Sequence, residues 1–284
     1  MDLAPADLAA AASHWDARLA LDYAWRDGRT VLARREHRGP LRVQRDLYPE
    51  GQETCHTIVV HPPGGIAGGD TLAIRAGMGE QAAALLTTPG ATKWYGALGP
   101  EARQTLDFTL GARAALEWLP QETIVFDGAR AVTQTCVRLE EESVYLGWEI
   151  LCLGRQASGE KFVRGMFKFN TDIWKGDVRL WSERGAIGGG DALLDSPVGL
   201  AGHTVCATLV AAGRDIDNAT LAACRTIAHG EHARAGITRL PEVCIARWIG
   251  DAGEDARHYF AKLWEVLRPA LRGRAAVMPR IWST

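Results

Sequence analysis

The sequence has no apolar run of about 18 residues, so no segment is long enough to cross a bilayer as a helix. Its first residues carry acids and no basic stretch, unlike a secretory signal peptide. The six cysteines are scattered and form no CxxC pair. These absences predict a cytoplasmic protein with reduced thiols and no membrane contact. The Ala-rich residues 1–13 are expected to be flexible.

An excess of charge of one sign is also missing. Lys and Arg total 32 and Asp and Glu total 34, which gives a net charge of −2 at pH 7. Nucleic-acid-binding domains usually show a clear basic excess, so we expect no nucleic-acid partner. The 284 residues suffice to bury a core without disulfides or a structural metal. No linker rich in Gly, Ser or Pro interrupts them, which predicts a single domain over residues 1–284.

Alternation of apolar and polar residues predicts strands over most of the chain. Leu19, Leu21 and Tyr23 share one face of a half-buried strand, and Asp27-Gly28 then supplies a hairpin turn. Many short strands favour a sandwich, a barrel or a β-solenoid, and no exact internal repeat chooses among them. Further β-branched or aromatic runs lie at 57–60, 85–88, 123–126, 135–139, 144–152 and 205–210.

Helical spacing occurs only near the C-terminus. Asp217 is a candidate N-cap for a helix over residues 217–229, which Gly230 would close. A stronger pattern covers residues 255–268 and is expected to end at Pro269. Two helices after a long β region predict a mainly β protein.

A glycine-rich loop follows one predicted strand, at residues 61–71. A phosphate-binding loop of this spacing requires Lys after its last glycine, to reach the phosphates. The chain has Asp70 there, whose carboxylate repels phosphate. We therefore expect no nucleotide binding or hydrolysis, and we expect Asp70 to accept backbone N–H groups within the turn.

Tight metal sites and catalytic constellations are not evident in the sequence. Cys55 and His61 lie on one predicted strand but are separated by roughly 20 Å at the rise of an extended chain. His229 and His232 are separated by Gly230, which is expected to break a shared helical face. No G-x-S-x-G motif occurs. No catalytic residue, tight metal site or tightly bound cofactor is therefore predicted.

Seven sequence blocks, taken together and in order, resemble the UreD (also called UreH) family of urease accessory proteins. One departure is Gly96, because the family often carries Arg after the tyrosine that is Tyr95 here. The blocks are GPLRVQR at 39–45, HPPGGIAGGD at 61–70, TTPGATK at 87–93, LEWLPQETI at 116–124, FDGAR at 126–130, WEI at 148–150 and LGRQASGE at 153–160.

This resemblance implies a mainly β, β-helix-like fold of many short strands with two α-helices in the C-terminal region. It also implies a non-catalytic chaperone scaffold for nickel insertion. Such a protein binds UreF, which recruits the GTPase UreG, and the assembly docks on apo-urease. Nickel (Ni²⁺) would pass through an internal passage as a transient cargo, and the accessory complex can contain a dimer of the chain.

Acids within the family-like blocks are the candidates for a nickel path. A conduit should bind its ion weakly and at several points, so that the ion can leave again. An alternative is that Arg155 or Arg164 pairs with these acids, since a buried carboxylate requires a partner. Trp248 and Trp264 are candidates for a partner interface, where Trp is enriched. The acids are Asp70, Glu117, Glu149 and Glu160.

Two other classes of protein remain open at this stage. A β-helical carbohydrate-active hydrolase or lyase would require two converging carboxylates, whose spacing the sequence does not reveal. A plain adhesion or ligand-binding β module would normally carry a secretory signal.

Overall fold

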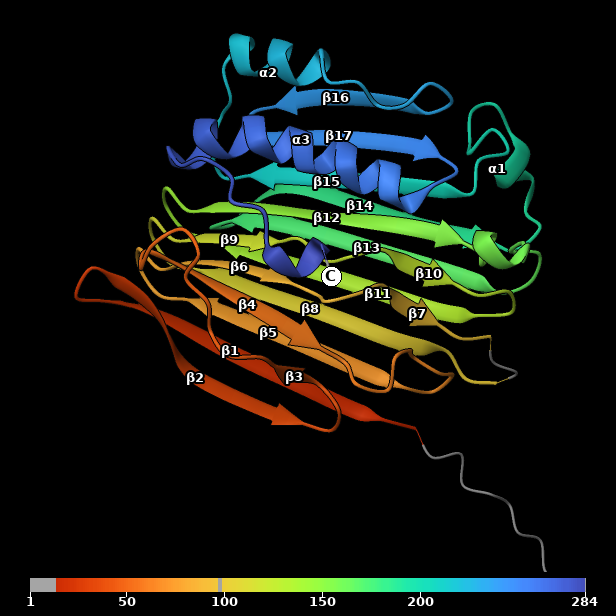
Figure 1. Cartoon of the computed structure of the whole chain (residues 1–284), viewed down its shortest axis with the longest axis horizontal. Helices are drawn as coiled ribbons and strands as arrows, with labels where there is room; N and C mark the ends of the chain where they lie inside the picture. Colours follow the sequence, from red (N-terminus) through yellow and green to blue (C-terminus); the bar gives the residue numbers. More distant parts are fainter. Residues whose placement is uncertain (1–13, 97–98, 284) are drawn as a thin grey trace, which may run out of the picture.

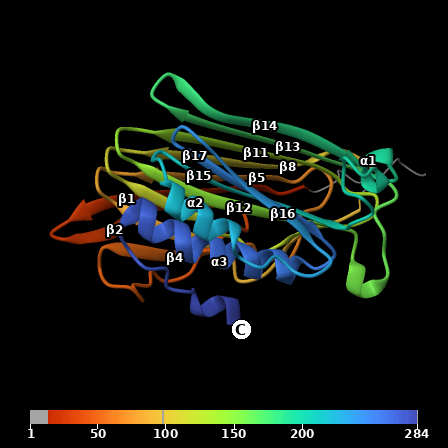
Figure 2. The same ribbon diagram turned by 90° about the horizontal axis from the view of Figure 1, so that it is seen from above.

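The computed structural model describes residues 14–96 and 99–283 and consists of two stacked β-sheets with helices on one side (Figures 1 and 2). The predicted flexible segment, residues 1–13, lies outside the described residues. The seven-stranded sheet has the order β14-β13-β11-β8-β5-β1-β2. Its strands are β1 (Asp16–Arg26), β2 (Arg29–Arg38), β5 (Thr71–Met78), β8 (Ala102–Leu110), β11 (Arg130–Leu139), β13 (Met166–Lys175) and β14 (Val178–Gly188).

The ten-stranded sheet has the order β16-β17-β15-β12-β9-β6-β4-β3, with β10 paired to β12 and β7. Each of the six predicted strand runs overlaps a strand of the structure. The strands are β3 (Arg42–Val43), β4 (Thr54–Val60), β6 (Ala83–Thr87), β7 (Thr92–Trp94), β9 (Ala115–Trp118), β10 (Thr123–Val125), β12 (Val144–Leu153), β15 (Val205–Ala212), β16 (Arg234–Leu240) and β17 (Val243–Gly250).

Successive coils of chain alternate between the two sheets. β5 leads into β6, β8 into β9 and β11 into β12, and each strand pairs in parallel with its counterpart in the next coil. The turns between them are alike, because Gln81, Arg113 and Glu142 all adopt left-handed backbone angles, with φ of 65°, 59° and 56°. The predicted β-helix-like fold is confirmed.

A hairpin closes one end of the seven-stranded sheet. Its turn is the predicted Asp27-Gly28, with φ of 50° and 78°, and β1 buries alternate residues as expected. β2 is the edge strand, and most of its residues are exposed, among them Arg34, Arg35 and Arg38.

Helices α2 (Asn218–Arg225) and α3 (Gly253–Arg272) cover the outer face of the ten-stranded sheet (Figure 2). The Asp217 side chain accepts a hydrogen bond from the Thr220 N–H at 2.7 Å, so the predicted N-cap is confirmed. The helix ends at Arg225 with Thr226 as its C-cap, rather than running to residue 229 and closing at Gly230.

The expectation that α3 ends at Pro269 is wrong, because the helix continues to Arg272 and closes at Gly273, with φ of 66°. Proline removes one backbone donor, but the last turn is held by other contacts. Leu271 is buried, and Arg272 is bonded to an acid in the sheet below. A third, unpredicted helix, α1 (Ala192–Asp195), is a single turn.

Two apolar cores result. One fills the space between the sheets, and the other lies between the ten-stranded sheet and the helices. No helix of the described residues combines the length and apolar character that crossing a membrane requires. The single-domain assignment stays a prediction.

Candidate functional site

A cavity of about 710 Å³ lies between the two sheets. Its lining is more apolar than polar, and part of the apolar lining comes from the inter-sheet core. A group of polar side chains interrupts this lining, and we call it the polar belt. The polar belt comprises Glu149, Glu183, Cys206, Thr208 and Arg247.

Strand register assembles the polar belt. In the ten-stranded sheet, Glu149 of β12 pairs with Thr208 of β15, which pairs with Arg247 of β17. In the seven-stranded sheet, Thr171 of β13 pairs with Glu183 of β14. Residues at paired positions point to the same face of a sheet, so both rows face the cavity.

Arg247 connects the two sheets. Its Nη1 donates to Oε1 of Glu183 at 2.7 Å and to Oγ1 of Thr208 at 3.2 Å. The Glu183 side chain is 14% exposed, whereas the Arg247 side chain is 52% exposed. The pair therefore joins an enclosed carboxylate to a guanidinium that lies half in solvent.

Glu149 differs from Glu183 in having no cation beside it. Within the described residues, no hydrogen bond or ion pair reaches its carboxylate. Burial raises the pKa of Glu149 to about 7, and the negative charge of Glu183 acts in the same direction. The carboxyl therefore gains and loses its proton near neutral pH.

Cys206 contributes a thiol rather than a thiolate. Burial, followed by the charges of Glu149 and Glu183, raises the pKa of Cys206 to about 12. No group of three or more His, Cys, Asp or Glu side chains that could hold a metal ion occurs in the described part of the chain. The belt thus offers carboxylate and hydroxyl oxygens suited to brief contacts with a cation.

Asp70, a predicted path residue, does not line the cavity. It is 2% exposed, and its carboxylate accepts the backbone N–H groups of Trp15 at 2.7 Å and Ala67 at 2.8 Å. The predicted role of Asp70 within the glycine-rich turn is confirmed. Its role in a nickel path stays a prediction.

Glu117 faces α3 on the opposite side of the ten-stranded sheet. Its carboxylate, in a residue 1% exposed, accepts from Trp264 Nε1 at 2.7 Å, Arg268 Nε at 2.9 Å and Arg272 Nη1 at 2.8 Å. The acid is fully paired, although by arginines other than Arg155 and Arg164.

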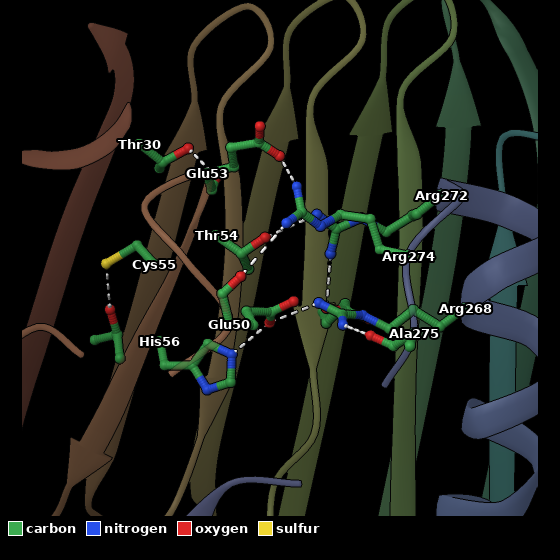
Figure 3. Close-up of polar contacts among 12 residues, drawn as sticks. Thr30, Glu50, Glu53, Thr54, Cys55, His56, Arg268, Arg272, Arg274 and Ala275 are labelled. Carbon is green, nitrogen blue, oxygen red and sulfur yellow. Dashed lines mark hydrogen bonds and ion pairs between the residues drawn. The ribbon is translucent and has the colours of Figure 1, made fainter. Parts of the chain in front are cut away.

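The same arginines extend this contact into a buried ion cluster (Figure 3). Arg268 Nη2 donates to Glu50 at 2.7 Å, and His56 Nε2 lies 2.6 Å from the same Glu50 oxygen. Burial acts to raise the pKa of Glu50, but the bonds from His56 and Arg268 outweigh it and lower the pKa to about 2. We call Glu50, His56, Glu117, Arg268 and Arg272 the outer ion cluster.

Glu160 also has a partner. Arg155 Nη2 lies 2.6 Å from its carboxylate, and this hydrogen bond lowers the pKa of Glu160. Arg164 pairs instead with Asp127 at 2.7 Å. Pairing with Arg155, the alternative raised from the sequence, is therefore what the structure shows for Glu160.

The two predicted interface tryptophans are buried within this chain. Trp264 is 0% exposed, and Trp248 is 1% exposed and donates to the His229 carbonyl at 2.9 Å. Both belong to the core beneath the helices. Contact with a partner stays a prediction, and in this conformation either residue would act by supporting the surface above it.

Gly96 occupies a tight position. A Cβ atom there would lie 2.4 Å from the Asp127 carbonyl oxygen. The close approach of the two loops therefore favours glycine at this position.

Sequence reasoning missed four residues of the polar belt. A signal exists for two of them, because Glu183 and Arg247 each interrupt a strand whose neighbouring inward positions are apolar or small. Thr208 and Cys206 carry no comparable signal.

Comparison with known proteins gives one consistent result. A sequence model of the family described as "UreD urease accessory protein" matches residues 16–283. The chain is 54% identical over 273 residues to "Urease accessory protein UreD" of Dechloromonas aromatica, which covers 95% of both chains. It is 50% identical over 277 residues to the protein of that name from Azoarcus sp., covering 98% of this chain and 97% of the relative. It is also 52% identical over 271 residues to the one from Pseudomonas aeruginosa, covering 95% of both. The chain therefore belongs to the UreD family of urease accessory proteins.

Proposed function

We propose that this urease accessory protein is a non-catalytic nickel-insertion chaperone that passes Ni²⁺ through the cavity between its sheets. It acts in the cytoplasm, in a complex with UreF, which recruits the GTPase UreG, and the complex delivers the ion to apo-urease. Two copies of the chain are expected in the complete complex.

Glu149 is the observation that carries this proposal. A carboxylate without a partner inside an apolar cavity is costly, and structural acids are normally paired. Its raised pKa, about 7, allows a proton to leave when a cation arrives and to return when the cation departs.

Weak binding is what a conduit requires. An ion held by many strong ligands would not leave again. The belt supplies two carboxylates, one of them already engaged by Arg247, and a thiol that is protonated at neutral pH. Nickel accepts oxygen ligands of this kind, so the belt suits a step on a path rather than a storage site.

Membership of the UreD family supports a role as a urease accessory protein over the alternative of a carbohydrate-active hydrolase or lyase. Relatives that align over nearly their full length are named urease accessory proteins. A scaffold of this kind needs no nucleophile and no nucleotide loop. Its partners would be UreF and, through UreF, UreG.

Glu149→Gln and Glu183→Gln test the path. We expect both variants to fold and to co-purify with UreF, while nickel-dependent urease activity in cells carrying the urease genes falls by about tenfold or more. Glu36→Gln on exposed β2 is the matched control and should activate urease normally. Full activation by both cavity variants, with complex formation intact, would refute passage through this cavity.

A further inference from the structure

The ion pair between Arg247 and Glu183 spans the open side of the β-sandwich. β14 is the last strand of the seven-stranded sheet, and β17 is the second strand from the matching edge of the other sheet. No strand joins the two sheets on this side among the described residues. The Arg247–Glu183 contact, 2.7 Å long, bridges them beside the cavity, and Lys175 at the end of β13 pairs with Glu242 in the turn between β16 and β17.

The two partners are held unequally. Glu183 is 14% exposed and fixed within the sheet, whereas the Arg247 side chain is 52% exposed. Among the described residues, the only other hydrogen bond of this guanidinium goes to Thr208, at 3.2 Å. A long side chain with half its surface in water loses little when it swings fully into solvent.

The carboxylates of Glu183 and Glu149 favour replacement of Arg247 by a divalent cation. If Arg247 leaves, the carboxylate of Glu183 and that of Glu149 both face the cavity, and like charges in an enclosed space repel each other. A divalent cation between them offsets both charges, whereas the guanidinium offsets one. The other titratable member of the belt, Cys206, is a neutral thiol.

From this geometry we propose that Arg247 is a displaceable latch: it closes the open side of the cavity by binding Glu183, and a divalent cation releases it by taking its place. The proposal rests on the proposed cation path and adds its regulation. In the absence of the ion the latch joins the two sheets. When the ion binds Glu183 and Glu149, the guanidinium moves into solvent.

Competition between Arg247 and the cation is directly measurable. The full-length protein, as its complex with UreF where required, is titrated with NiCl₂ by calorimetry. Arg247→Gln removes the competitor and should tighten Ni²⁺ binding by about fivefold, the factor expected for a half-exposed ion pair. In a Glu183→Gln background the same substitution should have no effect, because the contested carboxylate is gone.

Arg184→Gln is the matched control. Arg184 is the next residue on β14, is 67% exposed and lies 3.7 Å from Asp172, away from the cavity. Its replacement should leave Ni²⁺ affinity unchanged. Equal affinity of the Arg247→Gln variant and the native protein, with folding intact, would overturn the latch.

A second variant covers the case in which Arg247→Gln does not fold. Arg247→Lys keeps a positive charge but replaces the guanidinium, whose Nη1 binds both Glu183 and Thr208, with a more strongly hydrated ammonium. Ni²⁺ should displace it more easily, so its affinity should lie between those of the native protein and the Gln variant. An affinity equal to or weaker than the native value also overturns the proposal.

The two proposals fail in different ways. Normal urease activation by Glu149→Gln and Glu183→Gln refutes the cavity as the path to urease. Unchanged Ni²⁺ affinity on removal of Arg247, together with impaired activation by the two acid variants, refutes the latch alone.

Discussion

The two faces of the ten-stranded sheet treat buried acids in opposite ways. Glu117 on β9 pairs in register with Leu146, and Glu149 lies three residues further along β12, so the two carboxylates point to opposite sides. On the outer face, Glu117 accepts hydrogen bonds from three side chains of α3. On the inner face, Glu149 accepts none within the described residues.

This difference separates acids that hold the fold together from acids on the proposed cation path. The outer ion cluster pairs each carboxylate with a cation and anchors α3 to the sheet. The polar belt leaves one carboxylate without a partner and ties the other to a half-exposed arginine. Burial of charge alone therefore does not indicate function, whereas an enclosed carboxylate without a partner marks a candidate functional site.

The largest effect is expected from breaking the outer ion cluster. Arg268→Met leaves Glu117 and Glu50 without their shared partner, and should lower the free energy of unfolding by about 3–5 kcal/mol. Urea denaturation followed by fluorescence measures it. Arg38→Met, at a side chain 72% exposed, should change it by about 0.5 kcal/mol or less. Similar values for both would remove the distinction between the two regions.

Trp264→Ala should lower the free energy of unfolding by about 3 kcal/mol, because it removes a side chain that is 0% exposed and donates to Glu117. Thermal denaturation gives the change in stability, and co-purification below the melting temperature gives UreF binding. Trp15→Ala, half exposed in the segment just before β1, serves as control. Unchanged stability and unchanged UreF binding together would contradict any role for Trp264.

The same substitution should act with opposite signs on the two faces. Glu117→Gln should destabilise the fold. Glu149→Gln should stabilise it by about 2 kcal/mol at pH 8, because the native carboxyl must ionise in an apolar site there. The folded-state pKa, about 7, lies above the ordinary value of 4.5. Below pH 4.5 the protonated carboxyl of Glu149 contributes its full stability to the folded state. This contribution is lost as the pH rises through 7. Thermal denaturation at pH 5 and pH 8 tests this, and a variant no more stable at pH 8 would contradict the raised pKa.

The smallest effect is expected from Cys206→Ala. Its thiol is protonated at neutral pH, since burial and the two nearby acids raise the pKa to about 12. The variant should lose about 1 kcal/mol of stability, and its Ni²⁺ affinity at pH 7.5 should change by about twofold or less. A large loss of affinity would instead identify a thiolate ligand in the belt.

Local patterns of sequence predicted much of the fold. The alternation in β1, the Asp27-Gly28 turn and the Asp217 cap depend on neighbours within a few residues, which the sequence displays directly. The coil repeat was missed although Gly79 and Ala82 recur as Gly111 and Ala114. In the third coil the equivalent turn is formed by residues 140–143, so the turn keeps its length although its residue types differ.

The candidate site depends on pairing between distant segments. Glu149, Thr208 and Arg247 meet only because β15 pairs with both β12 and β17. No pattern in a single sequence gives the register of strands that lie tens of residues apart. Glu149 was predicted from its position in a family-like block, whereas its unpaired state follows from the three-dimensional structure.

The charged strand β2 lies at one edge of the β-helix. A coiled β structure presents open backbone donors and acceptors at its end, and another copy could add there to form a fibre. Exposed Arg34, Arg35 and Arg38 along this strand place like charges opposite any identical edge that approaches. The arginines thereby disfavour fibre growth through this edge.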